Sequence, residues 1–238
     1  MNMIARTALS GAAALACALG VSSEANAAFL AAICDDLACT GGNDIIVQDN
    51  GAGDTIGALG GINFSTSAFG YSLVVNTSQS KPLIGSATAP QLDLTYSATT
   101  NTAAAANIFL YASDTDFTSG TSFLLGLGGT NSGGTGSETG RAWGGTSNTS
   151  LQFSAANLLG AAGPLSGAAY SGTAAGSFSP VANPYSLTIG VAISRSSAGT
   201  STGDLNLQVA AIPEPETYAL MLAGLGAMGF VAKRRKAI

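Results

Sequence analysis

The fold of this chain is decided by two segments, Leu187-Thr-Ile-Gly-Val-Ala-Ile193 and Leu205-Asn-Leu-Gln-Val209, in which large apolar residues take every second position. Leu92-Asp-Leu-Thr-Tyr96 repeats the pattern. Successive side chains of a β-strand point to opposite faces of a sheet, so this period places one face in a core and the other in water. The three segments therefore predict half-buried antiparallel strands.

Similar short runs, separated by Gly, Ser, Thr, Asn and Asp, continue along the chain. They predict about nine strands, at residues 44–48, 61–65, 71–76, 91–97, 107–113, 122–127, 150–154, 185–194 and 204–210. The chain shows neither the heptads of a coiled coil nor the fixed repeat period of a β-solenoid. We therefore predict an all-β body, an antiparallel β-sandwich or jelly roll of about nine short strands.

Two stretches do not fit this pattern of strands. Residues 126–145 contain nine glycines in twenty positions and predict a flexible loop or a long hairpin tip. Residues 155–176 are rich in small side chains, and their start predicts one short helix at 155–159.

The composition excludes several classes of function. Histidine is absent, which removes the commonest general base and the commonest metal ligand. Between residues 28 and 212, three basic residues face ten acids, a net charge of -7, so we expect no nucleic-acid partner. Serines are plentiful, but without a histidine or a G-x-S-x-G elbow nothing activates one as a nucleophile. We therefore expect that the chain is not an enzyme.

The N-terminus has the three parts of a cleavable export signal. Arg6 precedes an apolar stretch at 8–21, and Ala25-Asn-Ala27 forms an A-x-A site, so we expect residues 1–27 to be a signal helix that is cut before Ala28. A lipoprotein signal ending at Cys17 is a minor alternative. In an exported body Cys34 and Cys39 predict a disulfide, with free thiols as the alternative; zinc would need further ligands that the chain lacks.

The C-terminus also has three parts in a fixed order. A Pro-Glu-Pro strip at 212–216 (with Pro213, Glu214, Pro215 and Glu216) precedes sixteen uncharged residues at 217–232 and a basic end at 233–238. Prolines keep the strip extended, and the apolar segment is close to the length of a membrane-spanning helix. The basic cluster would stop transfer on the cytoplasmic side. Its residues are Lys233, Arg234, Arg235 and Lys236. The body between the two signals is residues 28–211.

This tail, which begins Pro213-Glu-Pro-Glu-Thr-Tyr218, resembles the PEP-CTERM sorting signal over about 27 residues. The resemblance implies export by a Gram-negative bacterium that makes extracellular polysaccharide. It also implies recognition in the inner membrane by an exosortase, a membrane protease that cuts near the strip and passes the protein to the cell surface or matrix. Such tails are also called ice-binding protein C-terminal regions, and the tail alone does not imply ice binding.

The body contains three further candidate sites. Asp49, Asn50 and Asp54 form a Gly-punctuated run of oxygen ligands that predicts either a structural calcium site or a plain turn; no other cofactor is expected. Asp114 and Asp116 are the best carboxylate pair for a secreted hydrolase, with Asp35-Asp36 as the other tight pair, although turn acids are the simpler interpretation.

The third site is Trp143, which with the tyrosines could stack on sugars or could pack in the sandwich. The leading hypothesis is a non-catalytic cell-surface or matrix protein, held in the inner membrane as a precursor and exterior once mature. The alternatives are a carbohydrate-binding module for exopolysaccharide and, less favoured, a secreted hydrolase.

Overall fold

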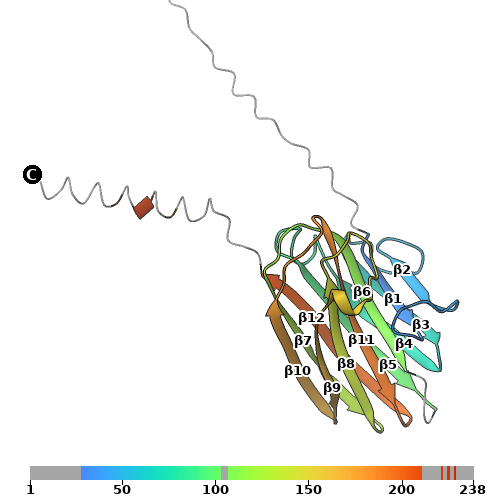
Figure 1. Cartoon of the computed structure of the whole chain (residues 1–238). Helices are drawn as coiled ribbons and strands as arrows, with labels where there is room; N and C mark the ends of the chain where they lie inside the picture. The colour runs from blue at the N-terminus through green and yellow to red at the C-terminus, as the bar shows by residue number, and fades with distance from the viewer. Residues whose placement is uncertain (1–27, 103–106, 211–220, 222–223, 226–227, 229–238) are drawn as a thin grey trace, which may run out of the picture.

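A computed structural model describes residues 28–102, 107–210, 221, 224–225 and 228. The described residues form twelve strands in two antiparallel six-stranded sheets and one short 3-10 helix, so the predicted all-β class is confirmed (Figure 1). The strands are β1 Leu30–Cys34, β2 Ile45–Gln48, β3 Gly61–Ala68, β4 Tyr71–Gln79, β5 Gln91–Thr100, β6 Ile108–Phe117, β7 Ser122–Ser132, β8 Gly136–Gly144, β9 Leu158–Ser166, β10 Ala169–Ser177, β11 Tyr185–Arg195 and β12 Gly199–Ala210.

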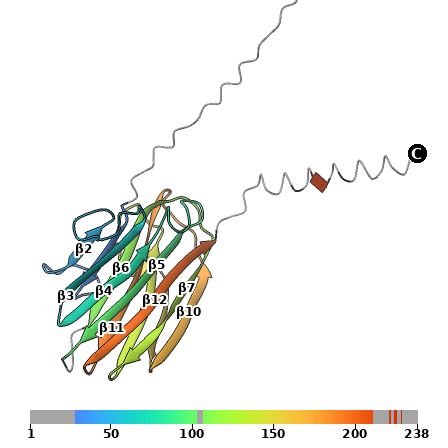
Figure 2. The same cartoon turned by 180° about the vertical axis from the view of Figure 1, so that it is seen from behind.

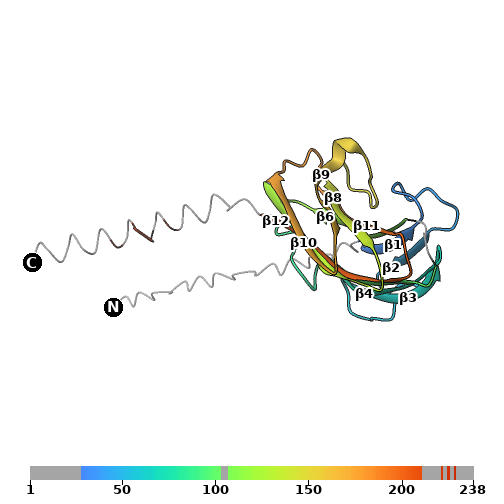
Figure 3. The ribbon, with the colours of Figure 1, turned by 90° about the horizontal axis from the view of Figure 1, so that it is seen from below.

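The two sheets pack face to face as a sandwich (Figure 3). Sheet A has the order β2-β1-β6-β11-β8-β9, and sheet B has the order β10-β7-β12-β5-β4-β3. From β5 to β12 the chain crosses between the sheets at every connection except β8 to β9. This winding is that of an eight-stranded jelly roll, widened by β1 and β2 on sheet A and by β3 and β4 on sheet B.

The core lies between the sheets and follows the period of two in the sequence. Buried and half-buried residues alternate along the whole of β5, and Leu92, Leu94 and Tyr96 are its largest inward side chains. Leu205 and Leu207 of β12 face inward beside them, because Leu205 pairs with Leu94 and Leu207 with Leu92. Each such leucine removed from water contributes about 1.5–3 kcal/mol, which fixes the register of the two strands.

The strand count differs from the nine predicted, and small residues explain the difference. The glycine-rich stretch predicted as a loop contains the end of β7 and the whole of β8, because glycine pairs in a ladder as well as any residue when its neighbours supply the packing. The stretch 155–176, which is rich in small residues, forms β9 and most of β10. β1, which begins two residues after Ala28, was also not predicted.

Two local predictions were wrong. Residues 150–154 form no strand; Leu151 and Phe153 in this segment instead pack on the outer side of sheet A. The helix expected at 155–159 is a single 3-10 turn, Ala155–Asn157, with Leu158 already extended. Ser154 makes no side-chain cap, and propensity alone does not hold a longer helix.

Both predicted terminal signals lie outside the described residues: the expected signal helix at 1–27 entirely, and the tail at 212–238 nearly so. Within the part that is described, no helix has the length and apolarity needed to cross a bilayer. The first described residue is Ala28, the residue after the expected cleavage site, and its N–H lies 3.4 Å from the Thr115 hydroxyl oxygen.

The sandwich has two different ends. We call one the tail end, because Ala210, the last residue of β12, lies there opposite Ser122 (Figure 2). It is built from the loops 49–60, 80–90, 118–121, 145–157 and 178–184. The other, distal end contains the disulfide loop 35–44 and the short hairpins at 133–135, 167–168 and 196–198.

Candidate functional site

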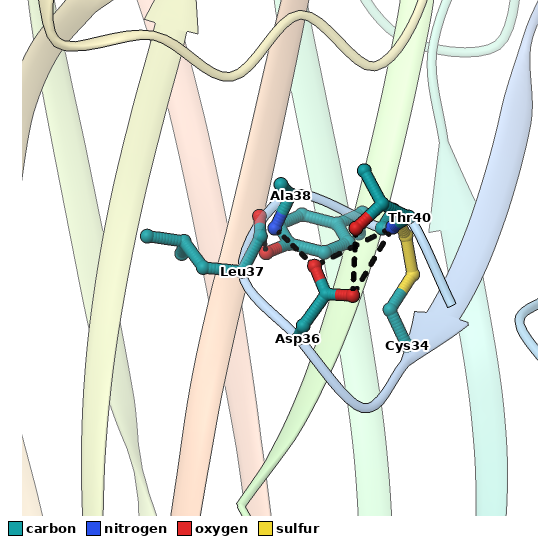
Figure 4. The surroundings of a disulfide bond; sticks show 7 residues. Cys34, Asp36, Leu37, Ala38 and Thr40 are labelled. Atoms are coloured by element: carbon teal, nitrogen blue, oxygen red, sulfur yellow. Dashed lines mark hydrogen bonds between the residues drawn. A yellow bond between two sulfur atoms is a disulfide. The ribbon is translucent and has the colours of Figure 1, made fainter.

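The loop after β1 is closed by a disulfide between Cys34 and Cys39, as predicted (Figure 4). Asp36 holds the loop from inside: its carboxylate accepts hydrogen bonds from the Ala38 N–H at 2.7 Å and from the Thr40 hydroxyl at 3.1 Å. Desolvation raises the pKa of Asp36, but the hydrogen bonds that its carboxylate accepts outweigh this effect, and the pKa is lowered. Asp36 thus stabilises the turn that the disulfide closes.

The proposed calcium ligands lie in the loop that follows β2. Asp49 Oδ2 accepts the Gly60 N–H at 2.7 Å, and Asp54 accepts the N–H groups of Asn50, Ile56 and Asn63 at 3.0–3.1 Å. Backbone N–H groups thus already bond to the carboxylate oxygens that would have to coordinate calcium. The arrangement is that of turns stabilised by aspartate. The residues do not fit a calcium site well.

The hydrolase candidates occupy different environments. Asp114 is fully buried, accepts the Ser80 hydroxyl at 2.5 Å and forms an ion pair with Lys81 at 2.8 Å. Asp116, at a positive φ of 62°, faces outward and accepts the Asn148 amide at 2.7 Å. The structure does not bring the two carboxylates to a shared cleft, so this pair lacks the geometry of a glycosidase.

Trp143 is buried, with 4% of its surface exposed. It lies on the outer side of sheet A, with ring centroids 6.0 Å from Tyr111 and 5.3 Å from Phe153. The loop 145–157 supplies Phe153 and covers this second, smaller apolar cluster. Trp143 is therefore a packing residue, and the interpretation as an exposed sugar platform is wrong.

A groove that the sequence did not reveal lies on the outer face of sheet B. Its floor is Gly126 and Gly128 of β7, and its volume is about 680 Å³. Ser171 and Thr173 of β10 form one wall, and β12 forms the other. The groove exists because the two glycines take outward positions where other residues would place side chains.

The β12 wall of the groove carries Asp204 and Asn206. Asp204 is opposite Thr95 and Asp93 is opposite Asn206, so the two aspartates are diagonal neighbours on adjacent strands. Burial and the nearby Asp204 carboxylate raise the pKa of Asp93 to about 7. Near neutral pH the pair therefore holds a proton for much of the time and offers both donor and acceptor groups.

The chemistry of this face is polar and lacks cationic groups. The six strands of sheet B contain no lysine or arginine, and threonine side chains cross-link neighbouring strands, as in the 2.8 Å contact between the hydroxyls of Thr130 and Thr202. Such a surface can hydrogen-bond a neutral polyhydroxyl ligand, but its strands offer no cationic side chain to attract phosphate. The sequence shows the glycines and polar residues of the groove, but it does not show that they are neighbours. Only strand pairing brings residues 126, 128, 171 and 204 together.

Three sets of predicted site residues lie outside the described part of the chain: the strip Pro213, Glu214, Pro215 and Glu216, the basic residues 233–236, and the expected signal-cleavage residues Ala25 and Ala27. Residues 211–236 match the family described as the PEP-CTERM protein-sorting motif. No curated protein matches the sequence significantly.

Two solved structures show a weak likeness. One is the enzymatically active domain of tailspike protein 4 of bacteriophage CBA120, with 12% identity and a TM-score of 0.39, over 63% of this chain and 19% of that one. The other comes from work on carbohydrate-binding modules of the β-sandwich superfamily, with 12% identity and a TM-score of 0.31, over 68% of this chain and 64% of that one.

The chain thus spans about a fifth of the first structure and just under two thirds of the second. Both TM-scores are below 0.5, so neither likeness carries an argument about function. The identification rests on the motif: this chain carries a PEP-CTERM protein-sorting motif at residues 211–236.

Proposed function

We propose that this chain is an exported, non-catalytic surface or matrix protein whose jelly-roll body is delivered by its sorting tail. The observation that carries the proposal is the match of residues 211–236 to the sorting motif. In this account an exosortase-type protease of the inner membrane recognises the tail, cuts near Pro213 to Glu216 and releases the body to the outside.

The order of residues in the tail supports this topology. The body precedes the apolar segment 217–232, and the basic residues follow it. Basic residues beside a membrane segment remain on the cytoplasmic side, which places the body on the opposite side. The disulfide between Cys34 and Cys39 suits that compartment, because disulfides persist outside the reducing cytoplasm.

The absence of catalysis is supported by the state of the polar side chains that the structure describes. Asp114 is paired with Lys81, and Asp116 accepts a hydrogen bond from Asn148 in the loop 145–157. Asp93 and Asp204 are diagonal neighbours on one open sheet face, whereas a glycosidase holds its carboxyls about 5 Å or more apart across a sugar.

The sorting step is tested by changing the strip. The variant Pro213→Ala/Pro215→Ala should accumulate uncut in the inner-membrane fraction, and wild type should do the same in cells that lack the protease. Pro180→Ala, which changes a proline in a loop of the body, is the matched control and should be processed normally. Equal processing of all three chains in both kinds of cell would refute the proposal.

A second candidate function, favoured by the groove on sheet B, is binding of exopolysaccharide. Gly128 is the residue to change, since a Cβ there would meet its nearest neighbours only at 3.7–4.0 Å, an ordinary contact. Gly128→Gln would fill the groove without disturbing the sheet and should weaken binding of a neutral polysaccharide at least tenfold in calorimetry. Gly42→Gln, in the open disulfide loop, is the control; equal binding by both variants would exclude the groove.

A further inference from the structure

Large exposed apolar side chains gather at the tail end. Of the seven in the described jelly-roll body, five lie in loops or at strand ends there: Leu59, Leu83, Leu124, Leu158 and Val181. Val181 is 87% exposed, Leu59 50% and Leu83 46%. The other two are Leu37 in the distal loop and Ile46 within β2. Single exposed apolar residues are ordinary, but their concentration at one end is a feature to be explained.

The loops that carry these residues are tied to the point where the tail begins. The Ala210 carbonyl accepts the Thr121 N–H at 3.1 Å, and the Thr121 carbonyl accepts the Phe178 N–H at 2.8 Å. Phe178 begins the loop that carries Val181, and the Val181 N–H bonds to the Gly145 carbonyl at 2.6 Å. This side of the tail end is therefore held together with Ala210.

The remaining loops join the same network. The Thr118 N–H donates to the Ala87 carbonyl at 2.8 Å, which links the turn 118–121 to the loop that carries Leu83. The Ser80 N–H donates to the Gly60 carbonyl at 2.9 Å, which links that loop to the one carrying Leu59. The exposed side chains at the tail end are thus fixed relative to the origin of the tail.

Chain length limits how far this end can lie from a membrane. Six residues, 211–216, separate Ala210 from the apolar segment that begins at Thr217. A fully extended chain advances about 3.3–3.6 Å per residue, so the connection spans about 20 Å at most. Once the segment is inserted, the tail end is held within that distance of the bilayer.

The charges at this end favour apolar contact over electrostatic attraction. The five loops contain two acids, Asp49 and Asp54, and a third, Asp116, lies next to them near the end of β6. Their one basic residue, Lys81, is engaged by Asp114. Without free cationic side chains the loops have nothing to attract anionic lipid headgroups.

We infer that the tail end of the jelly roll is a membrane-contact surface: in the anchored precursor Leu59, Leu83 and Val181 lie against the bilayer and enter its headgroup region. This inference rests on the proposed insertion of the tail. The contact holds the strip 213–216 at the membrane surface, where a membrane protease acts. It is short-range and maintained by the tether, so it ends when the tail is cut.

The test uses the whole chain inserted in phosphatidylcholine nanodiscs and amide hydrogen exchange of the loops around Leu59, Leu83 and Val181. A variant with twenty Gly/Ser residues inserted between Ala211 and Ile212 provides the untethered comparison. We expect at least threefold slower exchange in these loops in the unmodified chain. The hairpins at 133–135 and 196–198 should exchange at the same rate in both.

A second variant, Leu59→Ser/Leu83→Ser/Val181→Ser, keeps the tether and removes the apolar contact, and it should lose the protection while the distal hairpins stay unchanged. Equal exchange in all three chains would overturn the inference, as would protection that requires anionic lipid or an added exosortase. Insertion of the tail is measured separately by resistance to alkaline carbonate extraction. A chain that is extracted would refute the proposed anchoring itself.

Discussion

Lys81 and Asp114 form an ion pair inside the sandwich, with Lys81 Nζ 2.8 Å from Asp114 Oδ2. The ammonium also lies 4.2 Å from the centroid of the Phe117 ring and donates to the Thr115 carbonyl. The pair joins the loop after β4 to the end of β6, and therefore sheet B to sheet A. A carboxylate that the sequence offered as a catalytic candidate is a structural link between the two layers.

Removing one partner of this pair should be costly. Asp114→Asn leaves the Lys81 charge in the interior without its counter-ion, and we expect the free energy of unfolding to fall by about 3–5 kcal/mol. Urea denaturation followed by circular dichroism measures the loss. The matched control is Asp116→Asn, two residues away near the end of β6, where the side chain makes an exposed contact with Asn148; it should change stability by less than about 1 kcal/mol. Equal losses in the two variants would contradict the structural role of the pair.

The disulfide should stabilise the distal loop. Cys34→Ala/Cys39→Ala opens a loop closed over a sequence separation of 5, and the chain-entropy model gives a loss of about 2 kcal/mol. Thermal unfolding should show a lower Tm for the variant. Adding a reductant should lower the Tm of the wild type and leave that of the variant unchanged. A reductant that has no effect on the wild type would indicate free thiols.

The Asp93 carboxyl should make stability depend on pH. Its pKa is raised to about 7 in the folded protein, so between pH 4 and 7 the folded state binds more protons than the unfolded state. This contribution to stability is full below pH 4 and is lost as the pH rises through 7. Asp93→Asn should therefore have a higher Tm than wild type at pH 8, and the two should converge near pH 4.

Asp36 provides the opposite case for the same titration. Hydrogen bonds lower its pKa, so its carboxylate stabilises the fold above pH 4, and Asp36→Asn should lower the Tm at pH 8. If Asp93→Asn instead had a lower Tm than the wild type at pH 8, the result would contradict the claim that burial and Asp204 destabilise the ionised Asp93 carboxylate.

Trp143 should matter for stability and not for glycan binding. Trp143→Ala opens a cavity beneath the loop 145–157, and we expect a loss of about 3–5 kcal/mol in the free energy of unfolding. At a temperature where the variant is still folded, any polysaccharide affinity should equal that of the wild type. Loss of affinity in the folded variant, with full affinity in Gly128→Gln, would move the binding site from sheet B to this cluster.

The fold could be predicted from sequence wherever large residues alternate. β5, β11 and β12 were all expected, because every second side chain contributes to one core. β8 and β10 could not be predicted, because their inward residues are mostly glycine, alanine and a few polar groups. Glu138 of β8, for example, is fully buried and accepts a hydrogen bond from Asn131 of β7 at 3.0 Å. No local pattern in the sequence predicts such a buried pair.

The candidate sites divide in the same way. The disulfide was predictable, because two cysteines five residues apart can meet through a tight turn. The burial of Asp114 and Trp143 depended on Lys81 and Phe153, which are 33 and 10 positions away and brought near only by the fold. The groove on sheet B combines β7, β10 and β12, and their order in the sheet follows from the jelly-roll winding.

The central claim is that the body is exported and released from its sorting tail. Intact mass spectrometry of the protein recovered from the native cell surface and medium tests it most directly. We predict a mass that corresponds to a chain beginning at Ala28 and ending between Pro213 and Glu216. A mature protein that still contains Lys233 to Ile238 would contradict the claim and would make the tail a permanent anchor.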